Sequence, residues 1–160
     1  MRVYVAATLP LLRRWLADGQ APAGTAWAVT GALREWYREG DLEEMEYVAQ
    51  LAAARAALDL LTADPSAPRR RVVVAAEAPD PDVTPSGGPR AEVAVGVPMP
   101  TSQWASALVD GREAESVVAT AVDALPAAAA GDDEAAFALD EAAAVELGWY
   151  AVQELPPLFG

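Results

Sequence analysis

The chain opens with valines at alternate positions, Val3 and Val5, which predicts a strand over Arg2–Ala6. The apolar period then lengthens to that of a helix, which we expect to begin at an N-cap on Thr8 and to end at Gly19. The residues that share the apolar face of this helix are Leu9, Leu12, Trp15 and Leu16.

A second strand is expected over Thr25–Val29, followed by a short helix that Thr30 caps. The most strongly patterned element comes next. Asp41 and Glu44 have the spacing of a capping box, and apolar residues then recur at helical intervals until Asp64, which precedes a proline. This pattern predicts a long amphipathic helix.

The apolar run Val72–Val74 indicates a central strand buried on both faces, whereas Arg90–Val97 alternates like a strand with one buried face. We expect these two strands to pair as a hairpin with a long connection. That connection, Pro79–Pro89, is dense in proline, glycine and aspartate, so we expect a mobile surface loop without regular structure.

The last third of the chain is expected to be mainly helical. Gln103–Val109 favours a strand, and Asp110 with Glu113 has the spacing of a capping box for a new helix. Residues 126–133 form a low-complexity connection, and residues 134–155 favour a helix that Gly148 interrupts.

This order of elements predicts an α+β or mixed α/β fold. We expect a single-domain sandwich over residues 1–160, in which a sheet of four to five strands is covered mainly on one face by helices. Hydrophobic residues make up 53% of the chain, which suits a domain with its own core.

The composition removes most catalytic chemistry, because the chain has no histidine, cysteine, lysine, asparagine or isoleucine. It therefore lacks an imidazole base, a thiolate nucleophile and an amine for Schiff-base formation. The usual nitrogen and sulfur ligands of metals are missing too. The acidic residues Asp41, Glu43, Glu44 and Glu46 are adequately explained by their place at a helix start. We name no catalytic residue, metal site or cofactor, and the sequence favours a protein that is not an enzyme.

The formal net charge of −13 argues against direct binding of nucleic acid through a basic surface. It leaves open an acidic mimic that binds a basic nucleic-acid-binding protein. No apolar run approaches the ~20 residues of a membrane span, and the first residues do not have the pattern of a signal peptide. We therefore expect a cytoplasmic protein without membrane contact.

Two features carry binding hypotheses. Three consecutive arginines could gather around a phosphate or carboxylate, or could instead pair with nearby acids at the entrance of a strand. Two Trp-Tyr pairs beside glutamates could line a pocket for a cationic or planar ligand, or could pack in the core. The candidate ligand-binding residues are Arg69, Arg70, Arg71, Trp36, Tyr37, Trp149, Tyr150 and Glu154.

Four segments, in this order, resemble a family of small uncharacterised actinobacterial proteins that carry a domain of unknown function. The segments are RVYVAATLPLLRR, LREWYREGDLEEMEYVA, PRRRVVVAAE and ELGWYAVQEL, at Arg2–Arg14, Leu33–Ala49, Pro68–Glu77 and Glu146–Leu155. The resemblance implies a bacterial cytoplasmic protein and supplies no catalytic residue.

The leading hypothesis is a non-catalytic module that binds a protein partner or forms a homo-oligomer. The alternative is a protein that binds a small molecule or anion, or a carboxylate-dependent enzyme, which uses the arginine cluster. The acidic mimic is a further alternative.

Overall fold

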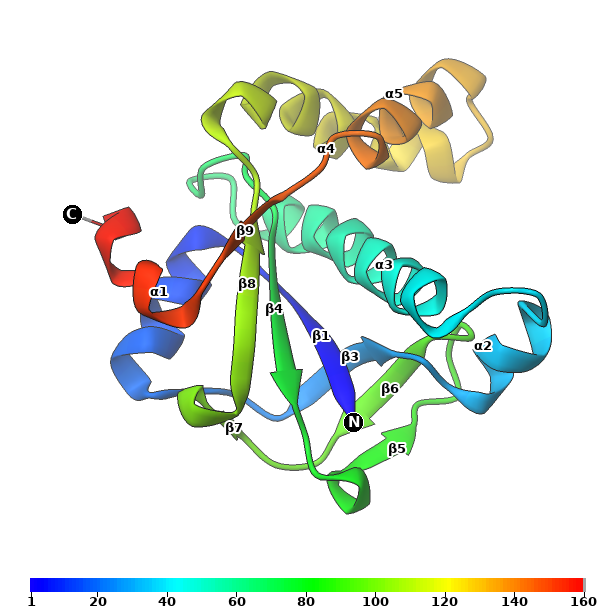
Figure 1. Ribbon diagram of the computed structural model, residues 1–160. Helices are drawn as coiled ribbons and strands as arrows, with labels where there is room; N and C mark the ends of the chain where they lie inside the picture. The colour runs from blue at the N-terminus through cyan, green and yellow to red at the C-terminus, as the bar shows by residue number, and fades with distance from the viewer. Residues whose placement is uncertain (160) are drawn as a thin grey trace.

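A computed structural model describes residues 1–159 of the chain. Its main feature is an antiparallel sheet of seven strands in the order β5-β6-β3-β1-β4-β8-β9 (Figure 1). These strands are β1 (Arg2–Ala7), β3 (Gly24–Ala28), β4 (Val72–Glu77), β5 (Val83–Pro85), β6 (Glu92–Val95), β8 (Trp104–Val109) and β9 (Gly148–Tyr150). The α+β class is confirmed, and the sheet is larger than the four to five strands expected.

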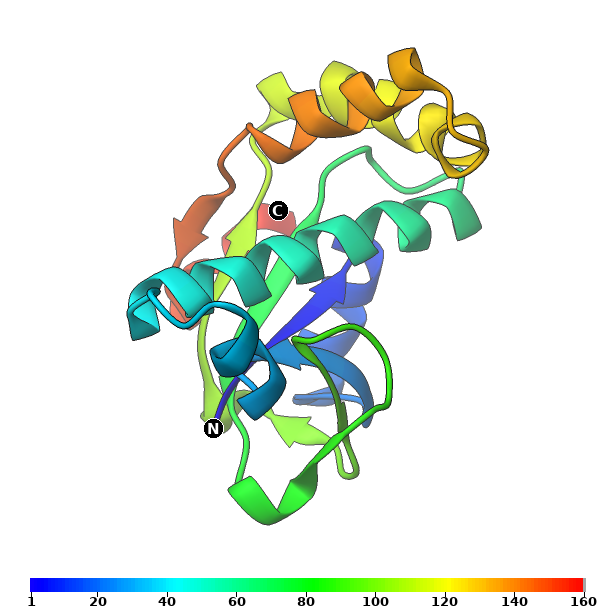
Figure 2. The ribbon, with the colours of Figure 1, turned by 90° about the vertical axis from the view of Figure 1, so that its right-hand side faces the viewer.

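Helices lie on both faces of this sheet, with more of them on one face (Figure 2). On that face α3 (Leu42–Ala63) packs against the sheet, and α4 (Glu115–Ala129) and α5 (Asp133–Ala143) form a further layer beyond its C-terminal half. The opposite face is covered by α1 (Leu9–Asp18) and the 3-10 turns η4 (Val152–Glu154) and η5 (Pro156–Phe159).

The central strand β4 explains this layering, because its side chains alternate between the two faces. Val73 packs in the core beneath α3, whereas Val72 and Val74 pack in the core beneath α1. All three valines are fully buried. The expectation that Val72–Val74 is a central strand buried on both faces is confirmed.

The first helix has the ends that the sequence predicts. The Thr8 hydroxyl accepts a hydrogen bond from the Leu11 amide at 3.3 Å, and Gly19 closes the helix in the left-handed region with φ 76°. Thr30 similarly caps α2 (Gly31–Trp36), and Asp41 caps α3. These local motifs fix where the helices begin.

The hairpin between Val72–Val74 and Arg90–Val97 was a wrong prediction. β4 pairs with β1 and β8, and β6 pairs with β3 and β5. The segment expected to lack regular structure contains the turn η1 (Asp80–Asp82) and the edge strand β5. An edge position tolerates the proline of this strand, because one side of an edge strand needs no donors.

The expected capping box at Asp110 was also wrong. The Asp110 carboxylate is buried against Arg71, and α4 begins after the turn η3 (Arg112–Ala114) without a side-chain cap. The helix α4 continues through Pro126 to Ala129, so the connection to α5 is shorter than residues 126–133.

The expected last helix stops at Ala143, and Gly148 begins the strand β9 rather than interrupting a helix. A second, two-stranded sheet joins β2 (Gln20–Ala21) to β7 (Met99–Pro100), and the turn η2 (Thr101–Gln103) follows it. Within residues 1–159, no helix combines the length and apolar character that crossing a membrane would require.

Candidate functional site

Arg71, the last residue of the arginine run, is buried and hydrogen-bonded inside the protein. Its guanidinium holds the Asp110 carboxylate through two hydrogen bonds of 2.7 and 2.8 Å, and its amide donates to the same carboxylate at 2.7 Å. A further bond of 3.1 Å reaches the Val145 carbonyl. Arg71 is 2% exposed and Asp110 is 0% exposed, so this pair is part of the core. The cavity of about 30 Å³ beside Arg71 is far smaller than a typical small-molecule site.

The other two arginines of the run point elsewhere. Arg69 donates to the Leu61 carbonyl at 2.6 Å, in the last turn of α3, where a cation is favourable. Arg70 donates through Nε to the Asp110 carbonyl at 2.8 Å. The three guanidiniums therefore do not converge on one anion site.

The two Trp-Tyr pairs lie at different places in the fold. Trp36 and Tyr37 are at the end of α2, where the Arg90 guanidinium lies 4.7 Å from the centre of the Trp36 ring. Trp149 and Tyr150 are on β9, the strand at the opposite edge of the seven-stranded sheet from β5 and β6.

Glu154 closes a local turn by accepting from the Ala151 amide at 2.8 Å. The candidate residues named from the sequence are thus distributed over the arginine run, α2 and the β9 region. They do not border a common cleft.

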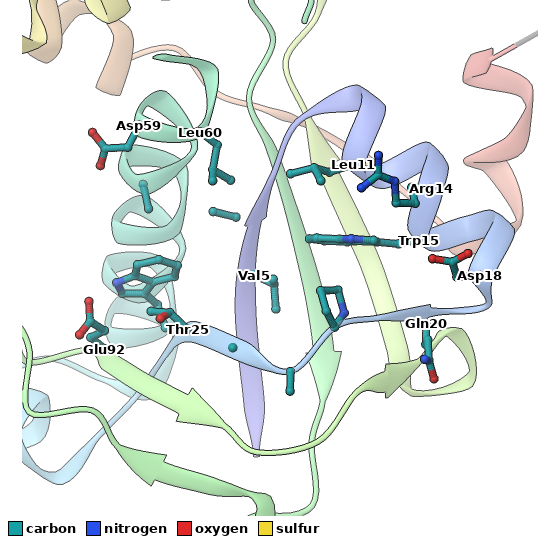
Figure 3. Close-up of a pocket in the computed structure, with 16 residues that line it drawn as sticks. Val5, Leu11, Arg14, Trp15, Asp18, Gln20, Thr25, Asp59, Leu60 and Glu92 are labelled. Atoms are coloured by element: carbon teal, nitrogen blue, oxygen red, sulfur yellow. The ribbon is translucent and has the colours of Figure 1, made fainter. Parts of the chain in front are cut away.

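A cleft lies where β1 and β3 separate (Figure 3). β1 pairs with β4 over its whole length, but its ladder with β3 contains only the pairs Val3–Ala28 and Tyr4–Trp27. The chain before β3 is held away from β1, because β2 pairs with β7 in the second sheet. Pro22, which follows β2, has no amide hydrogen with which to extend a ladder.

Hydrogen-bond alternation shows which groups of β1 face the cleft. Met1 and Ala78 exchange two main-chain hydrogen bonds, of 2.7 and 2.9 Å, in register with the ladder between β1 and β4. Every second residue from Met1 onward therefore bonds to β4, and the residues between them, including Tyr4 and Ala6, direct their N–H and C=O groups toward the side of β3.

The same argument applies to β3. Ala28 donates to the Ala91 carbonyl at 2.8 Å, in register with the ladder between β3 and β6. Thr25 and Trp27 therefore direct their main-chain groups toward β1. Continuing the register from Tyr4–Trp27 would pair Ala6 with Thr25, but the ladder has already ended. The main-chain groups of Ala6 and Thr25 are left facing the cleft from its two sides.

Helices on the two faces of the sheet form the walls of this cleft, whose volume is about 740 Å³. Figure 3 shows α3 on one side and α1 on the other, with β1 between them. The apolar part of the lining includes Val5, Leu11, Trp15, Trp27 and Leu60. The cleft is open to solvent and can take a ligand with apolar groups.

Four charged side chains line the cleft: Arg14, Asp18, Asp59 and Glu92. Within residues 1–159 none of the four takes part in an ion pair. Glu92 accepts a hydrogen bond from the Ser86 hydroxyl at 2.5 Å. Three carboxylates against one guanidinium make the cleft acidic, so it favours a ligand with positive charge.

Sequence reasoning missed this cleft, although part of its lining follows a visible pattern. Leu11, Trp15 and Asp18 recur at helical spacing along one edge of the core face of α1, to which Trp15 itself belongs. These residues line a cleft only because β1 and β3 separate, and no local sequence pattern predicts that separation.

The groups that line the cleft can hold a ligand through hydrogen bonds, apolar contacts and charge. The cleft offers main-chain donors and acceptors, apolar walls, three carboxylates and one guanidinium, and the chain has no histidine, cysteine or lysine to add to them. In the part of the chain that the structure describes, no three carboxylates lie close enough together to hold a metal ion.

Comparison with known proteins identified one family. The model of a family of unknown function, DUF6912, matches residues 1–159. No curated protein and no solved structure matched the chain. Because the match covers nearly the whole sequence, the chain belongs to the family of unknown function DUF6912.

Proposed function

We propose that this protein is a non-catalytic binding module that takes an extended segment of a partner protein into the cleft between β1 and β3. The observation that carries the proposal is the end of the β1–β3 ladder, which leaves main-chain groups of Ala6 and Thr25 directed into the cleft. Strand edges of this kind bind extended peptides through main-chain hydrogen bonds.

The shape of the cleft supports a peptide strand as the ligand. A strand that lies beside β1 places alternate side chains on the two faces of the sheet, where Trp15 and Leu11 stand on one side and Leu60 on the other. Apolar side chains of the bound segment would pack against these walls and contribute roughly 25 cal/mol per Å² of apolar area buried.

The charge of the cleft specifies the partner further. Asp18, Asp59 and Glu92 outnumber Arg14, and the whole chain carries a net charge of −13. A segment that combines apolar residues with arginine or lysine would satisfy both the walls and the carboxylates. Its association would be accelerated by attraction to the acidic protein.

The test is selection from a random peptide library displayed on phage, followed by calorimetry with the selected peptides. We expect sequences in which apolar residues alternate with stretches containing arginine or lysine.

Ala56→Trp places a large ring in the cleft from α3 and should weaken binding at least tenfold. The matched control is Ala63→Trp, at an exposed position at the end of the same helix and outside the cleft.

A second substitution tests the main-chain contact. Thr25→Pro removes an amide that faces the cleft and takes no part in the bonded pairs between β3 and β6. We expect a loss of roughly tenfold in affinity, because one hydrogen bond is lost and the proline ring crowds the strand. Thr25→Val, which keeps the amide, should bind nearly as tightly as the unaltered protein.

The proposal fails if no selected peptide is sensitive to Ala56→Trp or to Thr25→Pro. If the unaltered protein forms a dimer in sedimentation experiments and Ala56→Trp abolishes that dimer, the cleft binds a second copy of the chain instead of another protein.

A further inference from the structure

A second cavity, of about 550 Å³, lies along a neighbouring face of α1. It is bounded by α1, by the segment Pro68–Arg70 before β4, and by the C-terminal turn η5, which contacts α1 (Figure 1). Leu9, Leu158 and Phe159 give it an apolar wall. We call it the arginine groove, because its charged lining consists of Arg13, Arg14 and Arg70.

The charge of the arginine groove is opposite to that of the protein. The chain has 24 acidic residues and 11 arginines, yet among residues 1–159 three arginines and no carboxylate line this cavity. Ion pairs recorded within residues 1–159 involve Arg2, Arg71 and the N-terminus, and none involves the three arginines of the groove. The groove therefore concentrates positive charge that the described residues do not neutralise.

The groove is built on rigid parts of the molecule. Arg70 is held by the hydrogen bond from its Nε to the Asp110 carbonyl, and Asp110 is itself fixed by the buried pair with Arg71. The remaining guanidinium nitrogens of Arg70 make no hydrogen bond to residues 1–159. Arg13 and Arg14 are carried by α1, whose ends are fixed by Thr8 and Gly19. Binding would therefore need little reorganisation of the backbone or of Arg70, and its ordering cost would fall mainly on the exposed side chains of Arg13 and Arg14.

We propose that the arginine groove binds a small organic phosphate with an apolar body, at a site other than the cleft between β1 and β3, with which it shares Arg14. Guanidinium groups present several donors in a plane and match the oxygens of a phosphate. Leu9, Leu158 and Phe159 would cover the apolar part of the ligand. The cavity volume falls in the range of about 300 to 1,000 Å³ that is typical of small-molecule sites.

The test is calorimetric titration of the full chain with phenyl phosphate, inorganic phosphate and phenol. We expect phenyl phosphate to bind and inorganic phosphate to bind at least fivefold more weakly, because it lacks the apolar body. Phenol, which lacks the charge, should give no measurable binding. Binding of phenyl phosphate should weaken as salt increases.

Arginine variants locate the site. Arg13→Gln removes a charge from an exposed helical position and should weaken phenyl phosphate binding about tenfold, the usual effect of losing a charge-assisted hydrogen bond. Arg70→Gln should have a similar effect. Arg34→Gln, an exposed arginine on α2 and outside the groove, is the matched control and should bind normally.

The outcomes distinguish binding in the arginine groove from binding in the cleft between β1 and β3. Ala56→Trp, which fills the cleft, should leave phenyl phosphate binding unchanged. The proposal is overturned if phenyl phosphate does not bind at millimolar concentration, if inorganic phosphate binds as tightly, or if Arg34→Gln weakens binding as much as Arg13→Gln. Loss of phenyl phosphate binding in Ala56→Trp would also overturn it.

Discussion

Asp110 is the residue on which most of the buried polar structure depends. Its carboxylate accepts three hydrogen bonds from Arg71, and its carbonyl accepts one from Arg70. We expect Asp110→Ala to lower the free energy of unfolding by about 3–5 kcal/mol, because Arg71 would remain as a buried charge without its partner. Urea unfolding followed by circular dichroism measures this loss.

The matched experiment adds Arg71→Met to Asp110→Ala. Removing the unpaired charge should restore part of the lost stability, so the double variant should be more stable than Asp110→Ala alone. If Asp110→Ala lowers the free energy of unfolding by less than about 1 kcal/mol, Arg71 must reach solvent or another partner when the Asp110 carboxylate is removed.

Tyr4 gives the protein an alkaline pH dependence. Burial raises the pKa of its phenol above the ordinary value of 10.0, and the charge of Glu46, whose carboxylate lies 3.4 Å from the hydroxyl, raises that pKa further. Arg2 opposes the shift. The folded chain therefore holds this proton more tightly than the unfolded chain, so the free energy of unfolding should fall as the pH rises through and above 10.

The pH dependence of unfolding above about pH 9 is simple to interpret in this protein. Lysine and cysteine, which usually titrate in that range, are absent from the chain. Urea unfolding between about pH 9 and pH 11.5 should show a smaller decline for Tyr4→Phe than for the unaltered protein. Tyr47→Phe, at an exposed tyrosine on α3, should keep most of the decline. Equal declines in all three proteins would contradict the role of Tyr4.

At the scale of elements, α1 matters most, because it forms a wall of both cavities. Its C-terminal end depends on Gly19, which has a φ of 76° and no atom within 4 Å of the place where a Cβ would stand. We expect Gly19→Ala to cost about 1 kcal/mol of stability for conformational reasons alone, and Gly19→Asn to cost less. Thermal and urea unfolding of the two variants measure the difference, and a larger cost for asparagine would contradict this account.

The sequence predicted the elements that depend on local chemistry. Thr8, Thr30 and Asp41 cap helices as expected, and the valines of β4 occupy both faces of the sheet. A helix end is determined by hydrogen bonds within one turn, so its signature lies within a few neighbouring residues.

Strand pairing could not be predicted in the same way. The spacing of Asp110 and Glu113 is that of a capping box. The Asp110 carboxylate instead accepts a hydrogen bond from Arg71, which is 39 residues away in the sequence. The separation of β1 from β3 depends likewise on the pairing of β2 with β7, between residues such as Ala21 and Met99. The arginine run was noticed from the sequence, but only Arg70 reaches the groove, where α1 supplies the other two arginines.

At the scale of the whole molecule, most of the negative charge has no partner. The ion pairs within residues 1–159 involve only Glu77, Asp80 and Asp110 among the 24 acidic residues. Repulsion among the remaining carboxylates should therefore outweigh attraction, and it opposes the compact state. Added salt screens charges that are separated by more than about 10 Å at 0.1 M ionic strength.

These facts predict opposite responses to salt for folding and for binding. Raising sodium chloride from about 20 to about 300 mM should raise the midpoint of thermal unfolding by a few degrees, because screening weakens the repulsion among carboxylates. The same change should weaken the binding of phenyl phosphate to the arginine groove, because screening there weakens an attraction. Tetramethylammonium chloride at equal ionic strength is the control. It should raise the midpoint by the same amount if screening is the cause, because screening depends on ionic strength and not on the presence of sodium. A midpoint that falls with both salts would mean that the few ion pairs, rather than the unpaired carboxylates, dominate the electrostatic free energy of the folded chain.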